Sequence, residues 1–139
     1  MNRDKTVLKS QFDAACRVLG QLREAISPDY LALIANTGQP ITVVSSRQRV
    51  DNDAMAALAA SAFAATRQMA DIMAGSGFSL MLSEGAGVNI SIARVTEDIL
   101  LIISFSDSSE IGRVRLVTRP AIWQLAAIFN LERKTSGAD

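Results

Sequence analysis

The run ILLIISF at residues 99–105 constrains the fold more than any other part of this 139-residue sequence. Six of its seven residues are apolar, and they follow one another without the alternation of a half-buried strand. A continuous apolar run of this length is typical of a central strand that is covered on both faces. A chain with such a strand needs helices on both sides of its sheet.

The segments around this run supply further short strands and the turns between them. Gly38 and Pro40 lie in one turn, Gly85 and Gly87 in a second, and Thr96–Asp98 forms a third tight connection. Five β-prone runs are expected: 30–36, 41–46, 78–83, 88–95 and 99–105. Because consecutive strands are joined as hairpins, the sequence predicts a single antiparallel five-stranded sheet.

Three helices are expected, at residues 4–26, at 54–75 and from Ser108 or Ser109 to about Arg133. Ser27 and Pro28 end the first helix, and glycines at 75 and 77 end the second, whose N-cap is Asp51 or Asn52. Pro120 predicts a kink or break in the third. The order αββαβββα makes residues 1–139 one α+β domain, with a short flexible tail from about residue 134.

The second helix is unusual because ten of the twenty-two residues from 54 to 75 are alanine. At about 100° per residue, the half that contains Met55, Leu58, Phe63, Met69 and Met73 is expected to pack on the sheet. The other half carries only Arg67 and Asp71 as charges, and aligns Ala56, Ala60 and Ala64 in one row. That half is either a solvated face or, as we favour, the contact surface of a second helix.

The strand at 78–83 favours the second interpretation, because it has no charge and no proline. Exposed edge strands normally carry such features to prevent aggregation. Pairing of this strand with its copy in a second chain would remove the exposed edge and bring two alanine-rich helices together. The sequence therefore predicts a homodimer interface made by Ala56, Ala60, Ala64, Phe78, Leu80 and Leu82.

The element order, the NTGQP turn, the D-x-x-A-x-L-A-A start of the second helix, the G-S-G stop and the V-N-I-S-I strand resemble the Roadblock (dynein light-chain) family. This family is related to the longin fold, and its bacterial gliding-motility members are the most similar. The resemblance covers residues 9 to 130. An uninterrupted final helix is usual in the family, and Pro120 departs from that pattern.

The resemblance implies a homodimer whose third strands pair across a two-fold axis into one continuous sheet. The second helices would then lie together on one face of this sheet, and the first and last helices on the other. Members of the family are not enzymes themselves. They act as platforms for small Ras-like GTPases, sometimes accelerating GTP hydrolysis, or they anchor motor and signalling complexes.

Composition and charge exclude several classes of protein. Apolar residues make up 49% and charged residues 20% of the chain, as in globular domains. Fourteen cationic residues balance fourteen acidic ones, so we expect no binding to nucleic acid. The charged amino terminus does not resemble a signal peptide, and no apolar run is long enough to span a bilayer. These features predict a cytoplasmic protein without membrane insertion.

The residues for catalysis are also missing, and neither a cofactor nor a metal is expected. Histidine is absent, which removes the usual general base and the usual metal ligand. Cys16 is expected to fill space beside the apolar stripe of the first helix, and Gly85-Ala86-Gly87 lacks the lysine of a phosphate-binding loop. An enzyme is therefore the least favoured class.

Arginines are the remaining candidates for binding a partner. Arg47 and Arg49 precede the alanine-rich helix and Arg67 lies on it, so they could meet an acidic patch, although a solvated loop is the simpler interpretation. Arg113, Arg115 and Arg119 are expected on the solvated side of the last helix. A small-molecule sensor of PAS or GAF type is the alternative function; it would need a cavity with convergent polar groups, for which the strands offer Ser79, Asn89 and Ser91.

Overall fold

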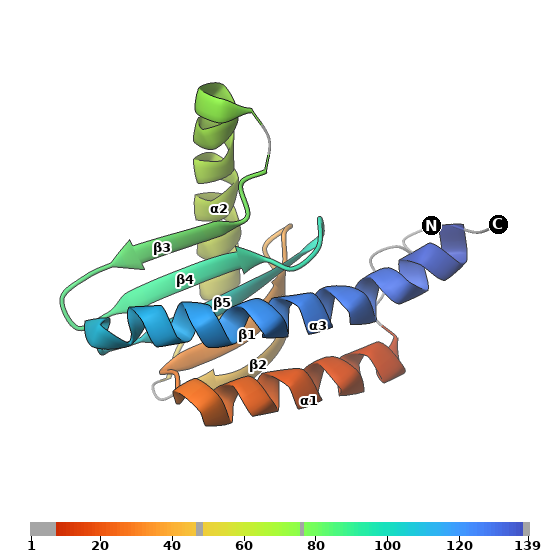
Figure 1. Ribbon diagram of the computed structural model, residues 1–139, viewed down its shortest axis with the longest axis horizontal. Coiled ribbons are helices and arrows are strands. Elements are labelled where there is room, and N and C mark those ends of the chain that lie inside the picture. The colour runs from red at the N-terminus through yellow and green to blue at the C-terminus, as the bar shows by residue number, and fades with distance from the viewer. Residues whose placement is uncertain (1–7, 47–48, 76, 138–139) are drawn as a thin grey trace.

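The structure is a computed structural model that describes residues 8–46, 49–75 and 77–137. Its elements follow the order expected from the sequence (Figure 1). They are α1 (Lys9–Ile26), β1 (Tyr30–Ala35), β2 (Pro40–Ser46), α2 (Asn52–Ala74), β3 (Leu80–Glu84), β4 (Asn89–Arg94), β5 (Ile99–Phe105), the short 3₁₀ helix η2 (Ser108–Glu110) and α3 (Ile111–Gly137).

The five strands form one antiparallel sheet in the order β2-β1-β5-β4-β3. Strand β5 lies at the centre, and all seven of its residues are buried. The apolar run at 99–105 is therefore covered on both faces, as predicted. The connection from β2 to β3 through α2 crosses the whole sheet, so the chain leaves one edge and returns at the opposite edge.

Helices cover both faces of the sheet (Figure 1). The antiparallel pair α1 and α3 lies on one face, where Leu19, Leu22 and Leu125 pack on Leu101 and Ile103 of the central strand. On the other face, α2 crosses the strands and packs on a second apolar cluster that includes Ala32, Ile34, Leu100 and Ile102. Alternate residues of β5 serve the two clusters, as the two-residue repeat of a strand requires.

The helix ends follow the predicted local signals. Ser27 adopts a left-handed conformation (φ 45°) at the end of α1, and its N–H donates to the carbonyl of Arg23. The side chain of Asp51 accepts from the backbone N–H of Ala54 at 3.1 Å, so Asp51 is the N-cap of α2. Asn52 instead accepts a 2.9 Å hydrogen bond from the hydroxyl of Tyr30, which ties α2 to β1.

Several boundaries differ from those expected. Within the described part of the chain α1 begins at Lys9, and the expected residues 4–7 lie outside that part. Strand β3 begins at Leu80, two residues late, because Gly77 and Phe78 are still used to return from the end of α2. Strand β4 begins at Asn89, one residue after the expected start, and Val88 is exposed.

The expected break at Pro120 is wrong, because α3 continues without interruption through this residue. Pro120 is exposed, and so is Leu116, the residue whose carbonyl loses its helical partner. That carbonyl can be satisfied by water, which makes an internal proline tolerable on this side of the helix. Helix α3 also extends to Gly137, past the expected end at about Arg133 and through the first residues of the expected tail.

Candidate interaction surface

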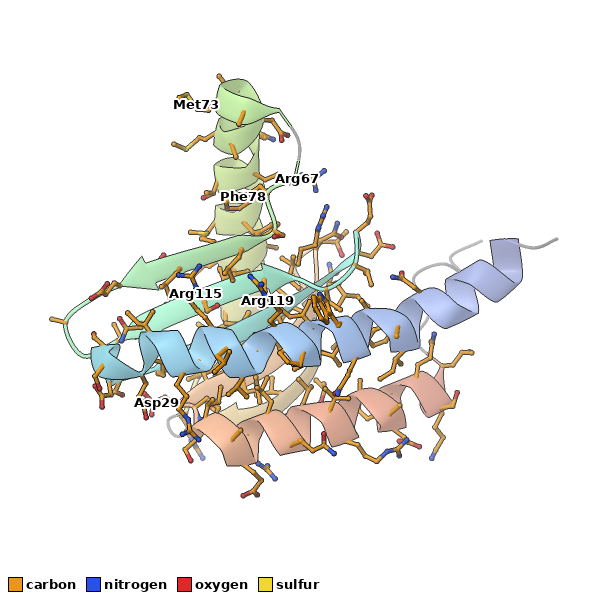
Figure 2. All side chains as sticks on the ribbon, viewed as in Figure 1. Asp29, Arg67, Met73, Phe78, Arg115 and Arg119 are labelled. Atoms are coloured by element: carbon orange, nitrogen blue, oxygen red, sulfur yellow. The ribbon has the colours of Figure 1, made fainter. Side chains whose placement is uncertain are left out.

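Helix α2 is longer than the sheet that supports it is wide. Its 23 residues span about 34 Å, whereas five strands are only about 19 Å apart from first to last. Because α2 crosses the strands, its C-terminal part projects past the edge strand β3, and Met73 lies at the projecting end (Figure 2). The buried residues of α2 end at Phe63, so the following eleven residues to Ala74 have no fully packed face.

The structure corrects the predicted orientation of α2 in part: Phe63 packs on the sheet as expected, but two of the aligned alanines do so too. Ala56 has no exposed surface, and Ala60 retains only 7% of its surface, because both pack on the sheet beside Ala59 and Phe63. They were expected on the outer face, as contacts of a second helix, and in this position they cannot make such contacts. Of the three aligned alanines, only Ala64 is exposed.

The small side chains bring α2 close to the domain's own sheet and loops. Gly38, in the β1–β2 turn, has φ 98°, and a Cβ atom built there would lie 3.3 Å from the Cα of Ala57. Alanines at 56, 59 and 60 allow the same close approach to the strands below. Small residues therefore do permit close approach, as expected, but α2 approaches the sheet and loops of its own domain and not a second helix.

Four of the large apolar side chains of α2 are exposed instead. Leu58 is 68% exposed, Met69 is 66% exposed, and Ile72 and Met73 are each 84% exposed. Leu58, Ala62, Ala65, Met69 and Ile72 follow one another at spacings of four, three, four and three residues. This is the spacing of residues that meet a second helix in a coiled-coil-like seam; we call these five residues the α2 seam.

The edge strand β3 lies beside the projecting part of α2. Its five residues pair with β4 in unbroken register, without a bulge or a proline. On its other side, no described strand pairs with β3. Leu80 is 36% exposed at this edge and Leu82 is half-buried against the α1–α3 cluster. Although β3 ends with the exposed Glu84, an edge with such regular register can pair with another chain.

Phe78 connects the edge to α2, although it precedes the strand. Its ring lies 5.3 Å from that of Phe63, with the ring planes tilted by 45°. This contact places Phe78 partly within the domain's own α2 cluster, below the projecting helix (Figure 2). Phe78 therefore supports the edge from inside, while the outward surface there is provided by Leu80 and the α2 seam.

A hollow of about 250 Å³, lined by both polar and apolar side chains, lies against α2. Arg67, Gln68 and Asp71 line it from α2, and Arg94 and Glu97 line it from the end of β4 and the turn that follows. Arg94 was not among the residues singled out in the sequence. It lies twenty-seven positions from Arg67, and only the packing of α2 across the sheet brings them together.

The predicted arginine group is not a single cluster. Arg49 is exposed just before α2, whose first residue, Asn52, lies about 22 Å along the helix from Arg67. Arg47 lies outside the described residues. Arg113, Arg115 and Arg119 are exposed on α3, as predicted, and Arg113 donates to the carbonyl of Ala25 at 2.6 Å.

Cys16 and Asn89, two further candidates from the sequence, are at least half-buried within the domain. Cys16 is half-buried on α1. Asn89 is buried and donates to the carbonyl of Phe105 at 3.1 Å, so it supports the β4–β5 pair. Over the residues that the structure describes, no group of acidic or cysteine side chains could hold a metal ion. In the same part of the chain, no helix combines the length and apolarity needed to cross a bilayer.

Comparison with known proteins identifies the family. The Roadblock/LC7 domain matches residues 17–105, which is more than half of the chain and runs from within α1 to the end of β5. The chain belongs to the Roadblock/LC7 family. No curated protein matches the sequence. The resemblance found in the NTGQP turn, the start of α2 and the strand V-N-I-S-I is thereby confirmed.

Solved structures with the same fold include bacterial gliding proteins. Myxococcus xanthus MglB is 25% identical, with a TM-score of 0.80 over 86% of this chain and 97% of that one. The gliding protein MglB of Thermus thermophilus is 22% identical, with a TM-score of 0.82 over 90% and 95%. Myxococcus xanthus MglC is 14% identical, with a TM-score of 0.54 over 84% and 98%. A further structure, 23% identical, is described as MglB with a tetrameric arrangement.

These similarities support a regulatory scaffold. The MglB structures confirm the gliding-motility type of Roadblock fold that the sequence suggested. The family assignment takes the place of the PAS or GAF alternative. The accessible features of the domain include the α2 seam, the β3 edge and the hollow around Arg67.

Proposed function

We propose that this protein is a homodimeric, non-enzymatic regulatory scaffold that binds a small Ras-like GTPase in the cytoplasm and modulates its GTP hydrolysis. The observation that carries the proposal is the α2 seam, an apolar row with exposed Leu58, Met69 and Ile72, on a helix that projects past a strand edge with no described pairing partner. Membership of the Roadblock/LC7 family supports it.

The dimer is proposed to form about a two-fold axis beside β3. Pairing of two β3 strands would satisfy the backbone groups at both edges and extend the sheet. Each projecting α2 would then lie above the partner's sheet, where Leu58, Met69 and Ile72 could bury their exposed surface against the partner's α2. A tetrameric arrangement of MglB shows that a protein with this fold assembles.

The dimer can be tested at the seam without disturbing the monomer. Leu58→Glu with Met69→Glu places charges at two exposed seam positions, so each folded monomer tolerates them. Loss of this apolar burial should raise the dimer dissociation constant at least about a hundredfold, measured by sedimentation equilibrium. Leu116→Glu with Val88→Glu, which also replaces two exposed apolar residues, is the control and should leave the constant unchanged. A seam variant that dimerises like the wild type would contradict the proposed interface.

The GTPase is proposed to bind the face of the dimer that carries the two α2 helices. Arg67 lies in the hollow beside α2, with Arg94, Asp71 and Glu97 around it. Two guanidinium groups and two carboxylates provide opposite charges for a polar partner surface, which favours specificity and association rate. Arg49, and Arg47 in the adjacent segment, would extend this contact at the start of α2.

The partner can be tested by affinity purification from native lysate with GDP or with a non-hydrolysable GTP analogue. A small GTPase retained in one nucleotide state is the expected result. Arg67→Glu should reduce its retention at least about tenfold, whereas Arg17→Glu, on α1, should not. If no GTPase is retained with either nucleotide, the GTPase part of the proposal is wrong, even if the dimer is confirmed.

A further inference from the structure

The face formed by α1 and α3 differs in charge from the rest of the domain. Of the described side chains, these two helices carry six of nine lysines and arginines, but only two of eleven aspartates and glutamates. The chain as a whole is neutral. The fold has therefore sorted the charges, so that a positive helix layer lies on one face of the sheet and most carboxylates lie elsewhere.

The outer surface of α3 adds exposed apolar groups to this charge. Trp123 is 68% exposed and Leu116 is 76% exposed, and Arg119 lies between them at helical spacings of three and four. Arg115 and Arg119 stand on the side of α3 that lies towards β4 and β3 in Figure 2. No described carboxylate pairs with either arginine. From Ile111 to Asn130 the helix carries three arginines and no acidic residue.

We propose that the α1–α3 face binds the surface of an anionic lipid bilayer peripherally, with Trp123 and Leu116 at the headgroup level. Tryptophan favours the membrane interface, because its ring is apolar and its N–H is polar. Arginines beside it are attracted by anionic headgroups. The hollows described in the structure lie beside α2, whereas this patch follows the outside of a helix. A broad, convex surface with dispersed cations suits a bilayer better than a groove-bound peptide.

This orientation is compatible with the proposed scaffold. The α2 seam and the hollow around Arg67 lie on the opposite face of the sheet, so bilayer binding through α3 would leave both accessible. A dimer formed beside β3 would also carry two such patches on the same face. Vesicle binding can be measured with this protein alone, without the GTPase.

The only tryptophan of the chain is Trp123, so its fluorescence reports directly on the proposed contact. Purified full-length protein is mixed with vesicles of phosphatidylcholine alone, or with about one third phosphatidylglycerol. The expected result is a blue shift and co-sedimentation with the anionic vesicles only, both weakened by salt. No shift with anionic vesicles, or an equal shift with neutral ones, would overturn the proposal and favour an acidic macromolecule as the partner of this face.

Charge reversal locates the contact. Arg115→Glu with Arg119→Glu should weaken co-sedimentation at least about tenfold and abolish the blue shift, with an unchanged far-ultraviolet circular dichroism spectrum. Arg49→Glu with Arg67→Glu makes the same change in net charge at two exposed residues on the α2 side, and should have less than about a threefold effect. Equal losses in both double variants would mean that overall charge, and not this face, controls binding.

Discussion

The two edges of the sheet are built differently. The edge strand β2 begins with Pro40, and its pairing with β1 shifts register twice, so that Ile41 and Val44 are bulged residues. The guanidinium of Arg23 donates to the carbonyl of Val44 at 3.3 Å, and both α1 and α2 pack on this strand. The edge strand β3 has five regular pairs, no proline and no bulge.

This difference indicates separate roles for the two edges. Proline, bulges and a covering side chain are features that prevent an edge from pairing with another chain. Strand β2 has all three, whereas β3 has none. We therefore expect changes at the β2 end to affect the stability of the monomer, and changes at the β3 end to affect association. Helix α2 takes part in both, because its first half is packed and its second half projects.

The largest effect is expected in the packed half of α2. Ala60→Glu would place a charge on the sheet, in a position with 7% exposed surface, and should lower the free energy of unfolding by about 3 kcal/mol or more. Ala64→Glu, one turn later and exposed, should change it by less than about 0.5 kcal/mol. Urea denaturation measures both. Equal effects would mean that Ala60 does not face the sheet.

A substitution at the β3 edge should change the dimer dissociation constant. Leu80→Lys would place a cation on the proposed two-fold contact, close to its counterpart in the partner strand, and like charges at such positions repel. The dimer dissociation constant should rise at least about tenfold, with little change in the unfolding midpoint measured on the monomer. Leu116→Lys makes the same substitution at an exposed leucine on α3 and should leave the constant unchanged. A Leu80→Lys dimer of wild-type strength would remove the distinction between the edges.

The turns next to the two edges provide a matched pair of glycines. Gly38 and Gly87 both have positive φ values, of 98° and 82°. A Cβ at Gly38 would lie 3.3 Å from the Cα of Ala57, whereas nothing lies within 4 Å of a Cβ at Gly87. Both alanine variants carry the backbone strain, about 1 kcal/mol, but Gly38→Ala should lose about 1 kcal/mol more. Thermal and urea unfolding test this difference, and equal losses would show that the turn does not press on α2.

The smallest effect is expected from pH at the β2 end. Burial raises the pKa of Tyr30, the only tyrosine, whose hydroxyl donates to the side chain of Asn52. The folded state favours the neutral phenol. The contribution of Tyr30 to the free energy of unfolding is therefore complete below pH about 10, and it is lost as the pH rises through the pKa of the folded state. The absorbance of tyrosinate in the folded protein should therefore appear at higher pH than in urea. Tyr30→Phe should remove the corresponding alkaline loss of stability.

Much of this architecture could be predicted from local sequence signals. The run at 99–105 has one stable environment, the centre of a covered sheet, because exposure of either face would leave large aliphatic side chains in water. Turn glycines, Asp51 and Ser27 act on backbone atoms within a few residues, so their effects can be read without knowing the rest of the fold. The family resemblance rests on the same local signals and their order.

The tertiary structure alone decided which side of α2 meets the sheet. Both sides of α2 are apolar, because one carries mainly alanine and the other carries a mixture of alanine, leucine and methionine. Periodicity therefore favoured the side with the larger residues as the side that packs in the core. The sheet instead selects alanine, because close packing under Ala56 and against Gly38 excludes larger side chains. Leu58, Met69 and Ile72 are left outside, and the meeting of Arg67 with Arg94 follows from the same crossing of α2. The chain determined its elements by local chemistry, whereas the fit of their surfaces determined which residues remain free to bind.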